Sequence, residues 1–511
     1  MSHNSTPTAV IVGAGVGGLS AAAILAHRGY RVIVLEADAS FGGKMREEEV
    51  GGARIDAGPT VLTMRPVLER VFQEAGARLE EHVGLRRAEV LARHLWQDGS
   101  ALDLWADPER SAAEIEALAG SREADGFRRF RAHIQRTYQM VEGPFLSAQR
   151  PGLASAAWAW GKRGPGAVLS IDAHRSMWSA ISGFFADPRL RQLWARYATY
   201  VGSSPFLAPA TLNLIAHVEL DGVWRVEGGM RRLAVALAGL VWARGGVIRT
   251  RSPVREILVQ DGRAVGVLDA QDQRIDADVV VLNASVDALR AGVLGAGARP
   301  AAGGGAVERS LSAVTLAGLA ELGGRPLLHH NVLFGQDPQA EFEALFRARV
   351  APADPTVYLC AQDRGDTPEL ARRPERVLMV VNAPATGDRD PQPEEIDACL
   401  SASEAVMGRC GVQVSWRARA LSSPQTFERR FPATGGALYG APSHGWSASF
   451  KRPAARTSIR GLYLTGGGAH PGAGVPMVAL SGLLACQAVS EDLPSTTPFH
   501  QAVTRGGIST R

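Results

Sequence analysis

Three glycines near the N-terminus have the spacing of a loop that binds a dinucleotide. Gly13, Gly15 and Gly18 follow the apolar run AVIV and form the pattern GxGxxG. The first glycine permits a tight turn, the second lets the backbone approach a pyrophosphate, and the third allows a helix to pack closely on a strand. Glu36 ends the next apolar run, where its carboxylate can accept hydrogen bonds from ribose hydroxyls. Together these residues predict a dinucleotide site.

Residues with small side chains follow Glu36, and they favour FAD over NAD as the cofactor. A pair of glycines comes just after the acidic residue, and a Gly-Pro-Thr segment comes soon afterwards. We expect these residues to contact the cofactor: Gly42, Gly43, Lys44, Gly58, Pro59 and Thr60. The glycine pair resembles that of the amine oxidase and phytoene desaturase superfamily, whereas an NAD-dependent dehydrogenase would usually continue into another helix here.

A second glycine-rich loop, TGGGAHPGAGVP, spans Thr465 to Pro476 near the other end of the chain. Its composition lets a large flat ring lie against backbone. A helix that starts at about Pro476 would direct N–H groups and its positive dipole end at the flavin N1/C2=O edge. The predicted flavin contacts are Gly467, Gly468, Gly474, Val475 and Pro476. His470 either fixes this loop, touches flavin or substrate, or transfers a proton.

The sequence also predicts the strands and helices that would hold the cofactor loops in position. We expect a strand at Ala9–Val12, a helix at Leu19–Arg28 and a second strand at Arg31–Leu35. A helix at Met230–Arg244 is followed by strands around a two-residue turn. In this stretch Val254 is expected to place backbone against the adenine, although a plain β-hairpin fits the same residues equally well.

These elements predict an α/β fold with a Rossmann-like FAD-binding domain built from three segments. The first FAD-binding segment is expected at 1–103, the second at 224–293 and the third at 443–494. Between them we expect a helical membrane or substrate region at 104–223 and a substrate-domain mixed sheet at 294–442, and a tail follows at 495–511. Stretches such as VTLAGLAELGG and ERVLMVVNAP are the expected strands of the substrate-domain sheet.

The first insertion is rich in tryptophan and arginine. Its aromatic residues are Trp158, Trp160, Trp178, Phe184, Phe185, Trp194 and Tyr200, with Arg163, Arg175, Arg189, Arg191 and Arg196 nearby. Trp with flanking Arg suits a membrane interface. The alternative is that these aromatic side chains form the core of a large helical domain.

Composition excludes several other functions. The net charge of +4 is too small to indicate nucleic-acid binding. The four cysteines show no CxxC spacing, so we expect reduced core thiols, no metal site and a cytoplasmic protein. No secretory signal and no apolar run of about 18 residues are present, so any membrane attachment would be peripheral.

A reaction that needs few catalytic side chains would explain why the sequence shows no motif for a nucleophile or a metal. Desaturation of a hydrocarbon beside a polyene is such a reaction. Desaturation beside a polyene transfers a hydride to flavin N5 and releases a proton, while the polyene itself delocalises the remaining positive charge. The protein then supplies an apolar tunnel, alignment and one proton acceptor. The candidates for that acceptor are Glu142, Glu219, His217 and His470, and the sequence does not choose among them.

Several motifs carry a family resemblance. The segments DAGPTVLTM, RYATYVGSSPFLAPATLNLIAHVEL, GVWRVEGGM and LYLTGGGAHPGAGVPM, with the N-terminal unit, resemble bacterial carotenoid desaturases of the phytoene desaturase type. The last three are most similar to the 1-hydroxycarotenoid 3,4-desaturase branch (hydroxyneurosporene and methoxyneurosporene desaturases). Ala469, Val475 and Met477 depart from the phytoene desaturase pattern and favour that branch.

The resemblance implies FAD as cofactor and a 1-hydroxylated acyclic carotenoid as substrate, which gains a C3–C4 double bond. It also implies peripheral attachment to the cytoplasmic face of the inner or photosynthetic membrane, and quinone or oxygen as electron acceptor. The alternatives are phytoene desaturase, a redox-neutral carotenoid isomerase, a flavin amine oxidase and a non-catalytic carotenoid carrier.

Overall fold

A five-stranded parallel sheet forms the centre of one half of the molecule. The computed structural model describes residues 6–146, 148–149, 171–304, 308–367, 374–390 and 392–493, so the predicted tail at 495–511 lies outside it. The strand order is β19-β13-β1-β2-β9. The bounds are β1 (Thr8–Val12), β2 (Arg31–Leu35), β9 (Val247–Arg249), β13 (Val279–Leu282) and β19 (Leu462–Leu464). These strands come from three separated stretches of the chain, as the sequence predicted.

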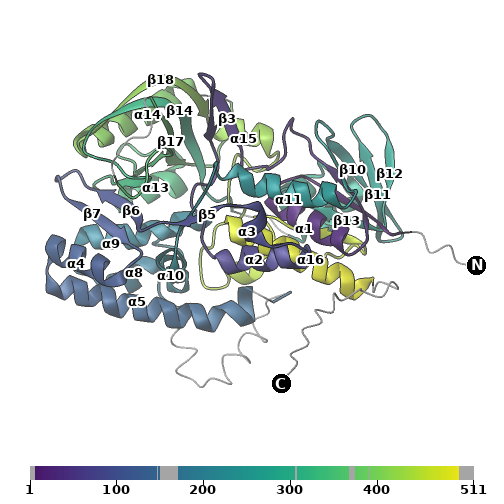
Figure 1. The fold of residues 1–511 in the computed structure, drawn as a ribbon, viewed down its shortest axis with the longest axis horizontal. Helices are drawn as coiled ribbons and strands as arrows, with labels where there is room; N and C mark the ends of the chain where they lie inside the picture. Colours follow the sequence, from purple (N-terminus) through teal and green to yellow (C-terminus); the bar gives the residue numbers. More distant parts are fainter. Residues whose placement is uncertain are drawn as a thin grey trace, which may run out of the picture.

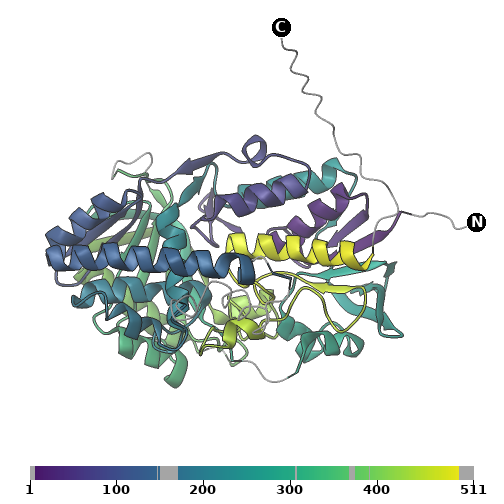
Figure 2. The same ribbon diagram turned by 90° about the horizontal axis from the view of Figure 1, so that it is seen from below.

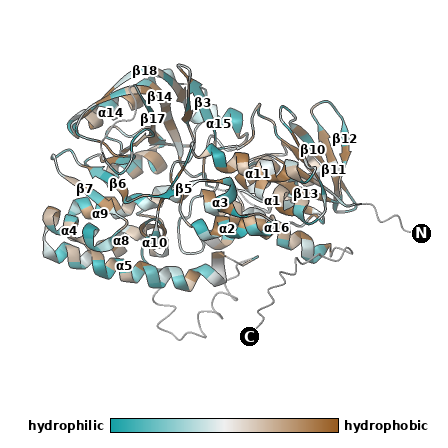
Figure 3. Cartoon of the chain, viewed as in Figure 1, coloured by the Kyte–Doolittle hydropathy of each residue, from teal (hydrophilic) through white to brown (hydrophobic). Residues whose placement is uncertain are grey.

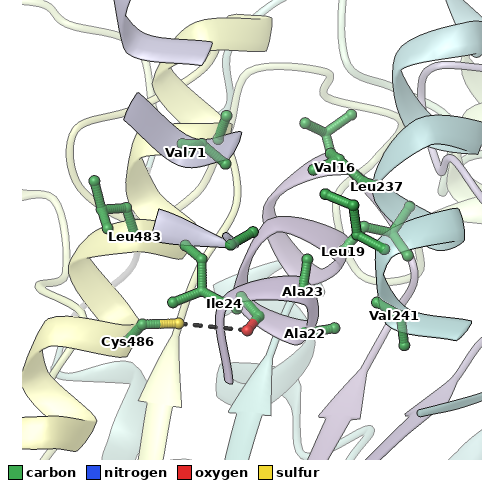
Figure 4. Packing of buried hydrophobic residues seen from close by; sticks show 14 of the residues in the cluster. Val16, Leu19, Ala22, Ala23, Ile24, Val71, Leu237, Val241, Leu483 and Cys486 are labelled. Atoms are coloured by element: carbon green, nitrogen blue, oxygen red, sulfur yellow. Dashed lines mark hydrogen bonds between the residues drawn. The ribbon is translucent and has the colours of Figure 1, made fainter. Parts of the chain in front are cut away.

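Alternate residues of β1 pack into two different hydrophobic clusters, one on each face of the sheet. Ala9 and Ile11 face a cluster formed with the helices α1 (Val16–His27), α2 (Arg65–Glu74), α11 (Arg231–Ala243) and α16 (Val475–Asp492). Figure 4 shows α1 residues of this cluster packed between α11 and α16, and this region is mainly brown in Figure 3. Val10 and Val12 face the antiparallel sheet of β10 (Val254–Gln260), β11 (Arg263–Asp269) and β12 (Arg274–Asp276). The two-residue periodicity of a strand separates the layers.

A seven-stranded mixed sheet forms the other half (Figure 1). Its order is β18-β14-β17-β16-β15-β6-β7. The bounds are β6 (Val90–Leu95), β7 (Ala101–Trp105), β14 (Ser312–Gly324), β15 (His330–Leu333), β16 (Val357–Ala361), β17 (Glu375–Ala383) and β18 (Val412–Ser422). The pairing of β15 with β6 is parallel and the others are antiparallel, so the predicted mixed sheet is confirmed.

Two strands of this sheet differ from the predicted boundaries. β6 lies wholly and β7 mostly within 1–103, the stretch predicted as the first FAD-binding segment, yet both complete the substrate-side sheet. Edge pairing explains this, because β15 offers β6 an unpaired edge and residue order alone does not reveal such a partner.

Helices cover the end of the molecule beside this sheet. They are α4 (Pro108–Ala119), α5 (Ser121–Val141), α8 (Met177–Ile181), α9 (Pro188–Ala195) and α10 (Leu214–Asp221). Seen from below, α5 runs towards α16 along one face (Figure 2), and Gln149 donates a hydrogen bond to Leu484 of α16. In the stretches of chain that the structure describes, no helix combines the length and apolar character needed to cross a bilayer.

Five of the aromatic residues predicted for a membrane interface instead pack in a core. They are Trp178, Phe184, Phe185, Trp194 and Tyr200, and they contribute to one hydrophobic cluster. Trp194 is fully buried and stacks on Phe127 with ring centroids 5.6 Å apart. The packing of these five fits the alternative interpretation, the core of a helical domain, because burial of their rings stabilises the helical region itself. Attachment to a membrane stays a prediction. Trp158, Trp160 and Arg163 lie outside the described residues.

Shorter elements connect these layers. They are β3 (Glu47–Val50), β4 (Ala53–Asp56), α3 (Leu79–His82), β5 (Leu85–Arg87), β8 (Trp224–Val226), α12 (Val286–Ala291), α13 (Pro338–Glu343), α14 (Pro393–Arg409) and α15 (Pro424–Arg430). The four cysteines are buried and free, as expected for core thiols.

Candidate active site

The N-terminal glycine loop leaves no room for side chains. Gly13 has φ +95°, a conformation that favours glycine. A Cβ on Gly18 would lie 2.2 Å from the carbonyl oxygen of Gly13, and one on Gly15 would lie 2.7 Å from Nδ2 of Asn283. No side chain of the described residues caps α1, and its first turn contains no acid. The loop therefore offers free N–H groups and close backbone approach, which fit a pyrophosphate.

The glycine pair Gly42-Gly43 packs directly against this N-terminal loop. The N–H of Gly42 donates to Ala14, and a Cβ on Gly43 would lie 3.1 Å from Cα of Gly15. Glu36 accepts hydrogen bonds from the N–H groups of Ala14 (2.7 Å) and Asp38, and burial raises the pKa of its carboxyl. The structure thus brings these predicted cofactor residues together at the carboxyl ends of β1 and β2.

Lys44 lies beside the same loop without an acidic partner. In the residues that the structure describes, no carboxylate lies within ion-pair distance of its ammonium, which donates to the carbonyl of Leu438 at 2.5 Å. Burial lowers its pKa to about 8. A Cβ on Gly58 would lie 2.0 Å from the Lys44 carbonyl, so the Gly-Pro-Thr segment packs directly against it. A cation in this position fits the phosphates of a dinucleotide.

Thr60 and Val254 are the two remaining residues predicted to contact the cofactor in the N-terminal and middle parts of the chain. Thr60 shares a 2.6 Å hydrogen bond with the hydroxyl of Tyr358 on β16. Val254 begins β10 and packs on the cluster that contains Leu35, and the preceding Ser252 donates its N–H to Glu36. The segment that leads into Val254 therefore lies beside Glu36 at the end of β2, which fits the adenine side of a dinucleotide.

Asn283 is a site residue that the sequence analysis missed. It follows β13, donates to the carbonyl of Gly13 at 3.3 Å, and would supply the first atom met by a Cβ at Gly13 or Gly15. The signal was present, because the carboxyl ends of adjacent parallel strands meet at one edge of a sheet. Thr465 follows β19 in the same way and lies against Gly17 of α1.

The C-terminal loop also fits a large cofactor ring. No side chain of the described residues caps α16, whose first turn has no acid and carries Pro476. Gly474 has φ +112° and is exposed, while Val475 and Pro476 are buried. Gly468 approaches Gly440, because a Cβ on Gly440 would lie 3.1 Å from Cα of Gly468. The loop therefore presents backbone and a helix N-terminus, the features predicted for the flavin edge.

Arg452 is a second cation beside this loop, and sequence reasoning did not single it out. Its guanidinium donates to the carbonyls of Gly467 (3.1 Å), Tyr439 (3.3 Å) and Ala441 (2.9 Å). Burial lowers its pKa to about 10. No carboxylate in the described stretches of the chain pairs with it. Lys44 and Arg452 thus hold neighbouring carbonyls of one segment and leave positive charge at the site.

An apolar cavity of about 520 Å³ adjoins the glycine loop. The C-terminal loop and the start of α16 contribute Pro471, Gly472, Ala473, Gly474, Pro476 and Met477 to the lining, and the region of α10 contributes Leu212, Leu214, Ile215, Val218 and Glu219. Further apolar lining comes from Val61, Met64, Val141, Leu146, Ile171, Trp446 and Phe450. Leu214, Ile215, Val218 and Glu219 lie on one face of α10, because residues spaced by three or four positions share a helix face. Such a space suits a long hydrocarbon.

Glu219 is the one acidic side chain among the described residues that line this cavity. It accepts a hydrogen bond from the Tyr197 hydroxyl at 2.8 Å and another from the Tyr200 hydroxyl. Arg196 lies 3.9 Å away. Burial and the neighbouring Glu219 carboxylate raise the pKa of both tyrosines, so both remain hydroxyl donors. An oriented carboxylate at the edge of an apolar space can accept a proton.

The other candidate acceptors lie elsewhere. His470 is 1% exposed, its backbone N–H donates to the carbonyl of Pro453, and it is not among the residues that line the cavity. Glu142 is exposed and accepts from Tyr138, although the nearby Val141 and Leu146 contribute to the lining. His217 packs on Tyr138 with ring centroids 4.9 Å apart, and burial lowers its pKa. Of the four, the structure places Glu219 alone on the described cavity wall.

The fold also assembles a cluster that sequence spacing did not reveal. Ligand-type atoms of His329, His330 and Cys360 lie within 4.8 Å of one another. The Cys360 sulfur lies 3.6 Å from Nε2 of His329, and Nδ1 of His330 lies 2.7 Å from the Tyr358 hydroxyl. Burial lowers the pKa of His329 to about 4 and keeps His330 neutral by lowering its pKa as well. These contacts form a buried hydrogen-bond network between β15 and β16.

Comparison with known proteins assigns this site to a family. The model of the flavin containing amine oxidoreductase family matches residues 16–490. The chain belongs to this family. The predicted flavin is therefore confirmed, and the dinucleotide-type loop identifies it as FAD. When bound, it would be held by the loops at Gly13–Gly18 and Gly42–Lys44 and by the start of α16.

Curated relatives cover nearly the whole length of this family member. A protein named hydroxyneurosporene desaturase from Rubrivivax gelatinosus is 48% identical over 511 residues, which are 99% of this chain and 97% of that protein. A second protein of that name, from Cereibacter sphaeroides, is 43% identical over 499 residues, covering 96% and 98%. A 4,4'-diapolycopene oxygenase from Methylomonas sp is 31% identical over 508 residues, covering 96% and 100%.

Solved structures share the fold at low identity. An oxidoreductase from Methanosarcina mazei has a TM-score of 0.61 at 19% identity and covers 94% of this chain and 100% of its own. A putrescine oxidase bound to putrescine has a TM-score of 0.59 at 15% identity, covering 95% and 99%. At these identities the similarity shows the flavin amine oxidase-type α/β fold alone.

Proposed function

We propose that this flavoprotein desaturates acyclic carotenoids that carry a hydroxyl at C1, introducing a double bond between C3 and C4. The observation that carries the proposal is the apolar cavity beside the C-terminal glycine loop, with Glu219 as the one described carboxylate on its wall. The relatives named hydroxyneurosporene desaturase support the substrate class. An amine substrate is less well supported, because the putrescine oxidase shares only 15% identity.

The reaction removes two hydrogens from neighbouring carbons. Bound FAD supplies an acceptor for the hydride that leaves C4, the carbon next to the polyene. The apolar walls hold the chain extended and exclude water, so the charge left on the substrate is spread over its double bonds. Glu219 takes the proton from C3, and the C3–C4 double bond forms. The hydroxyls of Tyr197 and Tyr200 hold the carboxylate in place for this step.

The proposal includes a membrane surface and a quinone or oxygen as the final electron acceptor. Trp446 lines the cavity and is 59% exposed, so an aromatic side chain lies where the cavity reaches the surface. An amphipathic ring at such a mouth suits the interface of a bilayer from which an apolar substrate enters. The location would then be the cytoplasmic face of the inner or photosynthetic membrane.

An anaerobic assay in liposomes tests the reaction. FAD-loaded protein and a quinone are supplied with 1-hydroxyneurosporene or with phytoene, and products are read by absorption and mass. Loss of two hydrogens from the hydroxylated substrate supports the proposal. Repeated desaturation of phytoene would instead make the protein a phytoene desaturase, and unchanged mass on both would indicate an isomerase or a carrier.

Three matched substitutions test the proton acceptor. Glu219→Gln keeps the shape and one acceptor oxygen but not the basicity, so we expect kcat to fall by about 10²–10⁴. His470→Gln and Glu142→Gln alter candidates that are not among the cavity-lining residues, and neither should cause a loss of this size. A larger loss in either of these variants than in Glu219→Gln would overturn the assignment.

A further inference from the structure

A hydroxyl that enters an apolar cavity must replace its hydrogen bonds to water. Leaving it unpaired would weaken binding by about ten- to hundredfold. The described side chains on the cavity wall that can form hydrogen bonds are Thr63, Tyr200, Thr211, Glu219, Ser443, Trp446 and Arg452, and the Trp446 indole only donates. Thr211 already donates to the carbonyl of Ile171 at 2.7 Å, and the Arg452 guanidinium donates to three carbonyls and accepts nothing.

The Tyr200–Glu219 pair offers the strongest acceptor on this wall. A carboxylate has about four lone-pair positions, and the two tyrosine hydroxyls occupy two of them. A hydrogen bond to a charged oxygen is roughly twice as strong as one between neutral groups such as Thr63 or Ser443. The Glu219 side chain is only 3% exposed, with Arg196 at 3.9 Å behind it, so the surrounding protein holds the acceptor in place.

The position of the hydroxyl on the substrate links binding to chemistry. C1 and C3 are separated by one carbon, so a group that holds the C1 hydroxyl lies beside the hydrogens of C3. One carboxylate can therefore bind the hydroxyl and reach the proton that must be removed. A chain without the hydroxyl would lack this alignment and could slide along an otherwise apolar wall.

We propose that the Tyr200–Glu219 pair is the binding site for the C1 hydroxyl and that this contact makes C3–C4 the bond that is desaturated. The inference rests on the proposed function and adds the specificity determinant to it. The hydroxyl donates to the Glu219 carboxylate, and the Tyr200 oxygen lies next to it on the cavity wall.

Direct binding measurements separate recognition from turnover. FAD-loaded wild type and variants are titrated with 1-hydroxyneurosporene and with neurosporene, which lacks the hydroxyl, and Kd is read from carotenoid absorption. We expect wild type to prefer the hydroxylated compound about ten- to hundredfold. Glu219→Gln should keep most of this preference although it loses turnover, because an amide oxygen still accepts. Glu219→Leu should abolish the preference.

Two tyrosine variants provide a matched pair. Tyr197→Phe and Tyr200→Phe each remove one hydroxyl that donates to Glu219, but Tyr200 lines the cavity and Tyr197 is fully buried behind it. We expect Tyr200→Phe to lower the preference for the hydroxylated compound at least about threefold and to shift the new double bond away from C3–C4 in some product. Tyr197→Phe should lower kcat, because its hydroxyl also holds the Glu219 carboxylate, but should retain the preference and the product.

The outcomes distinguish this inference from the proposed function. If wild type desaturates neither carotenoid, the proposed function fails. If wild type desaturates the hydroxylated carotenoid but Glu219→Leu keeps the full binding preference, the hydroxyl site is elsewhere and the inference fails alone. Equal loss of preference in the two tyrosine variants would also overturn it, since Tyr197 does not reach the cavity.

Discussion

Two cations without carboxylate partners among the described residues mark the cofactor side of the site. Lys44 and Arg452 bind carbonyls of Leu438, Tyr439 and Ala441, and burial lowers the pKa of both side chains. Buried charge is costly unless an opposite charge balances it. Lys44 lies beside the loop predicted for the FAD pyrophosphate and Arg452 beside the loop predicted for the flavin edge, so we expect both to respond to the cofactor.

The Lys44 pKa predicts a pH dependence of FAD binding. The free protein holds this ammonium with a pKa of about 8, and an adjacent phosphate would raise it. FAD binding should therefore be independent of pH below about pH 7, and should weaken about tenfold between about pH 7 and pH 9 as Lys44 loses its proton. Quenching of FAD fluorescence at several pH values gives the required Kd series.

A charge-free variant serves as the control for this prediction. Lys44→Met should bind FAD more weakly at neutral pH, and its Kd should not follow the wild-type pH profile. If Lys44→Met showed the same decline between about pH 7 and pH 9, another group would be responsible.

At the scale of elements, the crossing of α1 and α16 depends on glycine at the contact. A Cβ on Gly482 would lie 2.4 Å from the carbonyl of Gly17, and one on Gly17 would lie 3.0 Å from that of Val478. The two helices carry the two cofactor loops at their N-termini. Their close approach therefore sets the spacing between the phosphate loop and the flavin loop.

Substitution of Gly482 by alanine should destabilise the protein. Gly482→Ala would force the helices apart, and overpacking of this kind costs about 1–3 kcal/mol of unfolding free energy. Denaturant unfolding of the FAD-loaded protein measures the change. Gly239→Ala on α11 is the matched control, since a Cβ there meets nothing within 4 Å, and it should stabilise by up to about 1 kcal/mol. Equal effects at both positions would contradict the packing argument.

At the scale of the whole molecule, the cofactor site connects distant stretches of the chain. The central sheet takes β1 and β2 from the N-terminal region, β9 and β13 from the middle and β19 from the C-terminal region. Loops that follow β1, β2, β13 and β19 converge at the site. A ligand that contacts all of them should stabilise the fold as a unit.

Thermal unfolding with and without FAD tests this connection. A ligand present at about 100 times its Kd adds about 2.7 kcal/mol of stability, so FAD-loaded protein should melt several degrees higher than stripped protein. FMN lacks the adenine half that Val254 and Glu36 are expected to contact, and should raise Tm less. An equal shift with FMN would show that the phosphate and adenine loops contribute little.

Sequence alone determined the local elements and the cofactor loops. The N-terminal strand predicted at Ala9–Val12 and the helix predicted at Met230–Arg244 match β1 and α11 to within a residue at each end. Their patterns are local: glycine spacing, apolar periodicity and an acid at a strand end depend on neighbours in the chain. The family resemblance extended this to the cofactor, which the comparisons confirm.

Tertiary structure decided what lines the cavity. Glu142, Glu219, His217 and His470 were equivalent as sequence, and only the packing of α10 against the C-terminal loop put Glu219 on the wall. Tyr200, expected at a membrane interface, lies beside it, and Asn283 and Arg452 join the cofactor loops from distant segments. Burial and long-range contacts arise when separated segments pack together, and no local pattern in one sequence encodes them.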